Sequence, residues 1–199
     1  MATGTLRRVS AADDLLAANR GYAETFPHGH LPTEPARRLV VVCCMDSRID
    51  VFDALGLTLG EAHILRNAGG IVTEDVIRSL VISQHLLGTR AIVVVHHTDC
   101  GAQKFTDAGL SATIDERTGF TPPFALGAFE DLDESVRESL RKLRGSAYLI
   151  DTTDIRGFVY DVDTGRLREV SGTDVVAPAP PGAADAASVD TTTGSTTIA

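Results

Sequence analysis

The stretch Val41-Val42-Cys43-Cys44-Met45-Asp46-Ser47-Arg48 joins an apolar run to a cluster of polar residues. A second stretch, His96-His97-Thr98-Asp99-Cys100-Gly101, does the same after the apolar run 91–95. Short apolar runs rich in β-branched residues predict strands that are covered on both faces of a sheet. Parallel sheets bind ligands at the carboxyl ends of their strands, so the two polar stretches are expected to share one site.

These stretches supply thiols and an imidazole, which are metal ligands as well as proton carriers. Two sulfur donors and one nitrogen donor suit zinc, which favours four-coordinate sites. Three protein ligands leave the fourth position for water, as at a catalytic rather than a structural zinc. The sequence therefore predicts a catalytic Zn²⁺ centre at the junction of the two strands.

A family resemblance rests on three motifs in chain order. They are Cys44-Met45-Asp46-Ser47-Arg48, Arg66-Asn67-Ala68-Gly69-Gly70 and His97-Thr98-Asp99-Cys100-Gly101. Together they resemble the β-class carbonic anhydrases over roughly residues 10 to 170. The resemblance implies zinc ligation by Cys44, His97 and Cys100, and hydration of CO2 to bicarbonate and a proton by zinc-bound hydroxide. It also implies a homodimer, with a tetramer as the alternative.

Two charged residues of the first motif are the candidate catalytic pair. Asp46 lies two residues beyond a ligand, and it is expected to accept the proton of the hydroxide and so aim a lone pair at the substrate. Arg48 is expected to hold Asp46 through a charge-assisted pair. The resemblance implies both roles, and it implies that some members adopt a closed state in which the aspartate is a fourth metal ligand.

Gly69 and Gly70 are candidate substrate-binding residues, because glycines let backbone N–H groups approach a ligand closely. A simple turn is the alternative interpretation. Two thiolate ligands neutralise the charge of Zn²⁺, so the bound water should be less acidic than at a three-histidine site. Activity is accordingly predicted to rise on the alkaline side of neutrality.

The identity of the substrate stays open at this stage. Plant-type members of the family carry a glutamine and a phenylalanine where this chain has Pro35 and His63, so it resembles the small non-plant branch. The same zinc site also serves hydrolases of carbonyl sulfide and carbon disulfide, which are the alternative function. A structural zinc protein with Asp46 permanently on the metal is a further alternative. A redox protein using Cys43 and Cys44 is disfavoured, because the Cys-x-x-Cys spacing is missing.

Composition limits the remaining classes of function. The 199 residues carry a net charge of −9, which gives no reason to expect a nucleic-acid or anionic-membrane partner, and 43% are hydrophobic. No apolar run approaches the roughly 18 residues of a membrane span. A cytoplasmic enzyme acting on a small molecule is the expectation. Residues 1–173 are predicted to form one domain with a helix over about 10–26, and the Ala-, Pro-, Ser- and Thr-rich segment 174–199 is predicted to be disordered.

The alternation of strands and helices predicts an α/β fold with a mostly parallel, open sheet. Strands one and three must be neighbours if their polar ends are to meet, which gives the order 2-1-3-4 with helices on both faces. The family resemblance adds an antiparallel fifth edge strand and an N-terminal arm helix that lies across a partner subunit. The expected strands are 38–44, 62–66, 90–96 and 147–151, followed by a hairpin of 156–162 and 166–170. The expected helices after the first are 50–56, 73–87 and 131–144.

Overall fold

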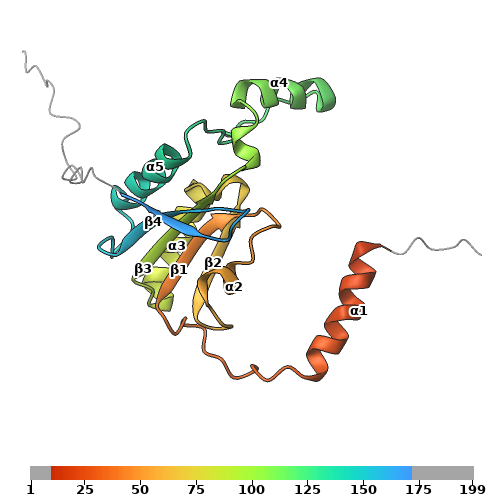
Figure 1. The fold of residues 1–199 in the computed structure, drawn as a ribbon, viewed down its shortest axis with the longest axis vertical. Helices are drawn as coiled ribbons and strands as arrows, with labels where there is room; N and C mark the ends of the chain where they lie inside the picture. The colour runs from red at the N-terminus through yellow and green to blue at the C-terminus, as the bar shows by residue number, and fades with distance from the viewer. Residues whose placement is uncertain (1–9, 172–199) are drawn as a thin grey trace, which may run out of the picture.

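The computed structural model describes residues 10–171. A single five-stranded sheet of order β2-β1-β3-β4-β5 forms its centre (Figure 1). The strands are β1 (Leu39–Cys44), β2 (Ala62–Asn67), β3 (Ala91–His97), β4 (Ile155–Tyr160) and β5 (Leu167–Val170). The helices are α1 (Ala11–Glu24), α2 (Val51–Leu55), α3 (Glu74–Leu87), α4 (Asp107–Thr118) and α5 (Leu132–Arg144), with 3-10 turns η1 (Ala68–Gly70) and η2 (Gly101–Gln103).

The predicted sheet topology is confirmed. The strand β1 pairs in parallel with β2 on one side and with β3 on the other, so that Val41 lies opposite both Ile64 and Val93. Continuing outward, β3 pairs in parallel with β4, and β4 pairs with β5 in antiparallel fashion. The chain order reverses between β1 and β3, and the carboxyl ends of these two strands carry both polar stretches.

Two cores, one on each face of the sheet, account for the apolar runs of the central strands. On one face, α3 and α5 pack through residues such as Leu80 and Leu140 onto Val42 and Val94. On the other face, Val41 packs among residues that include the first residue of α2. Strands covered on both faces bury successive side chains, which explains why β1 reads as an uninterrupted apolar run.

The helix α3 begins and ends as its sequence predicts. The Thr73 side chain accepts a hydrogen bond from the backbone N–H of Val76, which satisfies one of the free donors of the first turn. At its other end, Gly88 adopts the left-handed conformation that closes a helix with little strain. A capping box formed by Ser10 and Asp13 starts α1, close to the predicted beginning of that helix.

The prediction of a strand over residues 147–151 is wrong, and the fourth strand is β4. The expected terminal hairpin instead supplies both β4 and β5. Residues 147–151 form a loop in which Tyr148 and Ile150 are exposed. The Gln84 side chain of α3 binds this loop, accepting from the backbone N–H groups of Ile150 and Asp151 and donating to the Asp151 carbonyl. The loop thereby satisfies its backbone without joining the sheet.

The arm formed by α1 and the following segment stands apart from the sheet (Figure 1). None of its helical residues is buried, and the apolar Leu15, Leu16 and Tyr22 are exposed in the single chain. The helix α4 also has no buried residue, and no hydrophobic periodicity in its sequence predicts it. A segment of polar and apolar residues in no regular order offers no face to a core.

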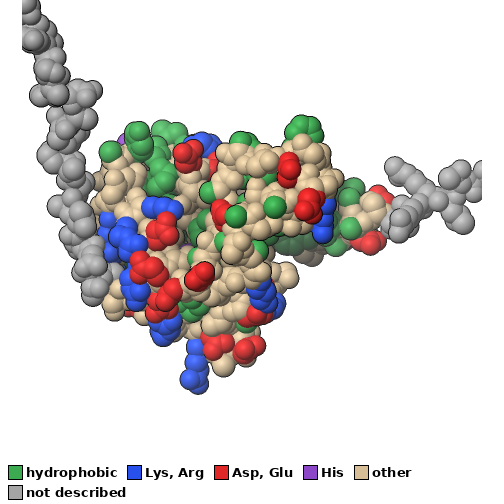
Figure 2. Space-filling view, turned by 90° about the horizontal axis from the view of Figure 1, so that it is seen from above, with side chains coloured by type: hydrophobic (Ala, Val, Ile, Leu, Met, Phe, Trp, Pro, Cys, Tyr) green, Lys and Arg blue, Asp and Glu red, His purple; other side chains and the backbone are tan. Residues whose placement is uncertain are grey.

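The surface of the described residues mixes charges of both signs (Figure 2). Exposed ion pairs such as Arg156–Glu169 and Arg168–Asp133 link β4 to β5 and β5 to α5. Within residues 10–171, no helix combines the length and apolarity needed to cross a bilayer. The segment 174–199 lies outside the described residues, and the division of the chain into one domain over 1–173 and a tail stays a prediction.

Candidate metal centre

The side chains of Cys44, His97 and Cys100 converge at the carboxyl ends of β1 and β3. One potential ligand atom from each lies within 4.8 Å of the other two, and all three residues are buried. The Cys44 and Cys100 Sγ atoms are 4.0 Å apart. Two sulfurs on one tetrahedral zinc, each at about 2.3 Å, would be about 3.8 Å apart. The spacing of the thiols therefore fits a shared ion of this size.

The His97 ring is oriented for ligation by its Nε2 atom. Its Nδ1–H donates a hydrogen bond of 2.8 Å to the Thr98 carbonyl, so Nε2 carries the free lone pair. This Nε2 is buried and has no hydrogen-bond partner among residues 10–171. A buried polar atom without a partner is costly unless a ligand satisfies it. The centre thus offers a nitrogen donor that is prepared for a metal ion.

The two thiols of the cluster share a proton. The hydrogen bond from Cys100 chiefly lowers the pKa of Cys44, to about 4, and the neighbouring His97 lowers it further. The same hydrogen bond raises the pKa of Cys100, because that thiol keeps the proton. Both thiols would have to be deprotonated to hold a divalent cation, so metal binding at this centre releases protons.

Asp46 borders the cluster and is held by Arg48. Its Oδ2 is 3.7 Å from the His97 Nε2. The Arg48 guanidinium donates to both carboxylate oxygens, with Nε at 3.0 Å from Oδ1 and Nη2 at 2.8 Å from Oδ2, and the Arg48 backbone N–H adds a third hydrogen bond. These bonds hold the pKa of Asp46 well below its usual range, so the carboxylate is ionised and accepts hydrogen bonds only.

The sequence did not reveal a role for Arg66, which fixes the strand end that carries Cys44 and Asp46. Its Nε donates to the Cys44 carbonyl at 2.9 Å and its Nη2 donates to the Asp46 carbonyl at 2.7 Å. The sequence does show a basic residue at the end of a predicted strand, directly before the flexible stretch Asn-Ala-Gly-Gly, and this position could have indicated such a role. Only the pairing of β2 with β1 shows what that residue reaches.

The two candidate substrate-binding glycines pack closely beneath the centre. A Cβ on Gly70 would lie 2.7 Å from the backbone nitrogen of Cys44 and 3.1 Å from the Val95 carbonyl oxygen. A Cβ on Gly69 would lie 3.3 Å from the Ile71 side chain, a tight contact that a small shift could relieve. Both glycines have positive φ angles. Close packing accounts for Gly70 and the left-handed backbone accounts for Gly69, and contact of either with a substrate stays a prediction.

Cys43 and His96 directly precede Cys44 and His97, and neither belongs to the cluster. Burial raises the pKa of Cys43 to about 11, so its thiol is neutral. His96 is fully buried beside the Phe129 ring, and burial lowers its pKa to about 4. Both side chains are therefore uncharged neighbours of the cluster near neutral pH.

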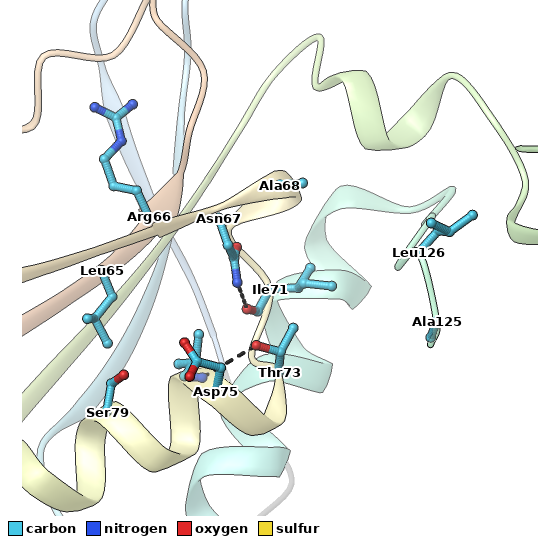
Figure 3. A pocket seen from close by; sticks show the side chains of 11 residues that line it. Leu65, Arg66, Asn67, Ala68, Ile71, Thr73, Asp75, Ser79, Ala125 and Leu126 are labelled. Atoms are coloured by element: carbon cyan, nitrogen blue, oxygen red, sulfur yellow. Dashed lines mark hydrogen bonds between the residues drawn. The ribbon is translucent and has the colours of Figure 1, made fainter. Parts of the chain in front are cut away.

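A pocket of about 310 Å³ lies beside the centre, between β2, η1, the first turns of α3 and residues 125–126. In Figure 3, the Asn67 side chain donates to the Ile71 carbonyl at the pocket wall, while the Arg66 side chain points away from it. The three metal-ligand candidates do not line this pocket. It therefore adjoins the centre through Asn67 and Ala68 without containing it.

Comparison with known proteins places these features in a family. A family model described as carbonic anhydrase matches residues 39–124. The chain is 48% identical over 163 residues to β-carbonic anhydrase 1 of Mycobacterium tuberculosis, an alignment that covers 82% of this chain and 99% of that protein. The chain belongs to the β-carbonic anhydrase family. The recognition made from the three sequence motifs is thereby confirmed.

Two further matches show the breadth of the β-carbonic anhydrase family. The crystal structure of the carbonic anhydrase of Streptococcus mutans superposes with a TM-score of 0.79 at 49% identity, covering 83% of this chain and all of that one. A carbon disulfide hydrolase of an Acidianus species is 36% identical over 157 residues, or 67% of this chain and 77% of that protein. Family membership therefore includes relatives that are named for two different substrates.

Proposed function

We propose that this chain is a zinc enzyme that converts CO2 and water reversibly to bicarbonate and a proton. The supporting observation is the buried Cys44, His97 and Cys100 cluster with an ionised carboxylate, Asp46, at its edge. Zinc held there would lower the pKa of a coordinated water and so supply a nucleophile on the alkaline side of neutrality. The 48% identity to a β-carbonic anhydrase supports the same assignment.

The chain's own residues would act in three ways. The Sγ atoms of Cys44 and Cys100 and the Nε2 of His97 would hold the ion. The Asp46 carboxylate can only accept hydrogen bonds, so it would orient the attacking hydroxide by accepting a hydrogen bond from it at Oδ2. The bidentate contact with Arg48 would keep that carboxylate ionised and aimed away from the ion.

Hydrolysis of carbon disulfide or carbonyl sulfide is the second candidate function. The relatives named carbon disulfide hydrolase support it, and both sulfur compounds, like CO2, are linear molecules open to attack at carbon. A non-catalytic structural zinc site is a third and weaker candidate. It would require Asp46 to leave Arg48 and occupy the fourth ligand position.

A homodimer, or a tetramer built from it, is proposed as the working assembly. The arm helix α1 presents Leu15, Leu16 and Tyr22 without burying any of them in its own chain. A second copy of this chain would cover these side chains.

The reduced thiols that the site requires fit a cytoplasmic location, which cell fractionation would test.

The deciding experiment compares turnover of the zinc-loaded chain on CO2, carbonyl sulfide and carbon disulfide at about pH 8.5. We expect fast CO2 hydration, and we expect Asp46→Asn, which keeps the size but loses the charge, to lower kcat by about 10²-fold or more. Lys142→Gln, on the exposed face of α5, is the matched control and should leave turnover unchanged. Sulfide release with poor CO2 turnover would favour the second candidate, and inactivity on all three would leave the structural one.

A further inference from the structure

Arg48 is held from two sides, and only one of them is the catalytic carboxylate. On the opposite side, its Nη1 donates to the Asp99 Oδ2 at 2.9 Å and its Nη2 donates to the Asp99 carbonyl at 3.0 Å. Asp99 lies between the candidate ligands His97 and Cys100 in the sequence. The loop that carries two candidate metal ligands therefore also binds Arg48, the residue that positions Asp46.

Asp99 is itself constrained at both its backbone and its side chain. Its φ angle is +52°, a left-handed conformation that places its carbonyl and carboxylate on the same guanidinium. The second carboxylate oxygen, Oδ1, lies 2.6 Å from the Lys104 Nζ, just after η2. Asp46, Arg48, Asp99 and Lys104 thus form a row of alternating charges from the metal centre to the surface.

We propose that Asp99 and Lys104 are positioning residues, which act through Arg48 to keep Asp46 turned away from the fourth ligand position. The proposal rests on the part of the proposed function that assigns metal binding to Cys44, His97 and Cys100. Asp46 Oδ2 is 3.7 Å from the ligand atom of His97, so a modest rotation would bring it onto the ion. The contacts of Asp99 with Arg48 and Lys104 determine how readily Asp46 makes that rotation.

The physical case rests on how the contacts combine. Arg48 is partly exposed, and a single exposed ion pair contributes little because solvent screens it and its side chains lose freedom. All three nitrogens of the Arg48 guanidinium donate hydrogen bonds, so its side chain has already lost its conformational freedom. Each further contact therefore mainly fixes the orientation of the guanidinium. Removal of the outer contacts would leave Arg48 free to swing with Asp46 or to release it.

The test uses the cobalt-substituted protein and imidazole, a ligand that is neutral at about pH 8.5 and therefore insensitive to the change in charge. Uptake of imidazole at the fourth position is followed by the visible spectrum of the cobalt ion. Asp99→Asn keeps a residue that tolerates the left-handed conformation while removing the charge. Lys104→Gln tests the outer contact alone, and Lys104→Arg restores it. Lys142→Gln removes the other lysine of the chain and serves as the matched control.

We expect Asp99→Asn to weaken imidazole binding by about tenfold, the equivalent of one hydrogen bond to a charged group. Lys104→Gln should weaken imidazole binding by about threefold. High salt should screen the exposed Lys104–Asp99 pair of the wild type and so bring wild-type affinity down to that of the variant. Lys104→Arg and Lys142→Gln should match the wild type. Every protein is first checked for one cobalt ion per chain and for its melting temperature.

Wild-type affinity in both Asp99→Asn and Lys104→Gln would overturn the proposal, as would a wild-type protein that takes up no imidazole. Turnover on CO2 separates this result from the function itself. Active wild-type zinc enzyme with unresponsive variants would overturn only the positioning role. The expected imidazole shifts in a protein inactive on CO2, carbonyl sulfide and carbon disulfide would sustain the positioning role and overturn the proposed function.

Discussion

Replacement of Gly70 by alanine should damage both the fold and the metal centre, because the added methyl group has no room. The φ angle of Gly70 is +68°, and its Cβ would lie 2.7 Å from the Cys44 backbone nitrogen and 3.1 Å from the Val95 carbonyl oxygen. Both atoms belong to the backbones of central strands, which cannot move aside as a flexible side chain can. Relief of the clash would displace Cys44, one of the three proposed metal ligands.

The size of the effect can be separated into two contributions. A left-handed conformation costs a residue with a Cβ about 1–2 kcal/mol. Forcing a methyl group into a packed interior costs about a further 1–3 kcal/mol. The chain offers a control for the first contribution, because Gly88 has φ +69° and open space around its Cβ position. Gly88→Ala should therefore show the conformational cost alone.

The assay is thermal unfolding of both variants without metal, followed by measurement of zinc content after reloading. The expected gap in stability between Gly70→Ala and Gly88→Ala is about 1–3 kcal/mol, or roughly 2–12 °C in melting temperature for a domain of this size. Gly88→Ala should bind zinc fully and Gly70→Ala should bind it weakly. Equal melting temperatures with full zinc content in both variants would refute the packing argument.

Three further changes probe other parts of the molecule. Asp107→Ala removes a carboxylate that accepts hydrogen bonds from the backbone N–H groups of residues 126–128, and these bonds lower the pKa of Asp107. The variant should lose its full share of melting temperature at pH 7. The difference from the wild type should shrink as the pH falls below about 4 and through the folded pKa, because the wild-type carboxylate is then protonated. Gly157→Ala places a methyl group against Val136 and should lower the free energy of unfolding, measured by denaturant titration, by about 1–3 kcal/mol. Wild-type stability in this variant would contradict the tight packing of α5 on β4. Arg48→Lys loses the bidentate contact and should lower kcat about tenfold or more at unchanged zinc content, whereas unchanged kcat would mean that charge alone suffices.

The central strands and the approach of Cys44 to His97 could be predicted from the sequence because local and long-range signals agree there. Apolar runs buried on both faces end abruptly in Cys44 and His97, and the ends of adjacent parallel strands meet at one edge of the sheet. The approach of these two residues follows from the order of β1 and β3 alone. Cys100 lies in the loop that follows β3, and its place in the cluster was expected from the family resemblance and not from strand order.

The loop at residues 147–151 shows where such reasoning fails. Its apolar composition favours a strand, but its backbone groups bind the Gln84 side chain, which lies more than sixty residues earlier in the chain. The second partner of Arg48 was equally hidden, since the contact with Asp99 depends on a left-handed residue in a loop. Sequence patterns report which faces are apolar, and they do not report which distant side chain satisfies a given backbone group.

The exposed arm helix α1 has a consequence for how the protein behaves on dilution. Its 14 residues are near the lower limit of length at which an isolated helix holds together in water. With no buried residue in its own chain, this helix would be stabilised by the second copy in the proposed homodimer. The far-ultraviolet circular dichroism of the protein should accordingly weaken at nanomolar concentration, and protease cleavage should then begin within residues 11–38 while the sheet remains intact.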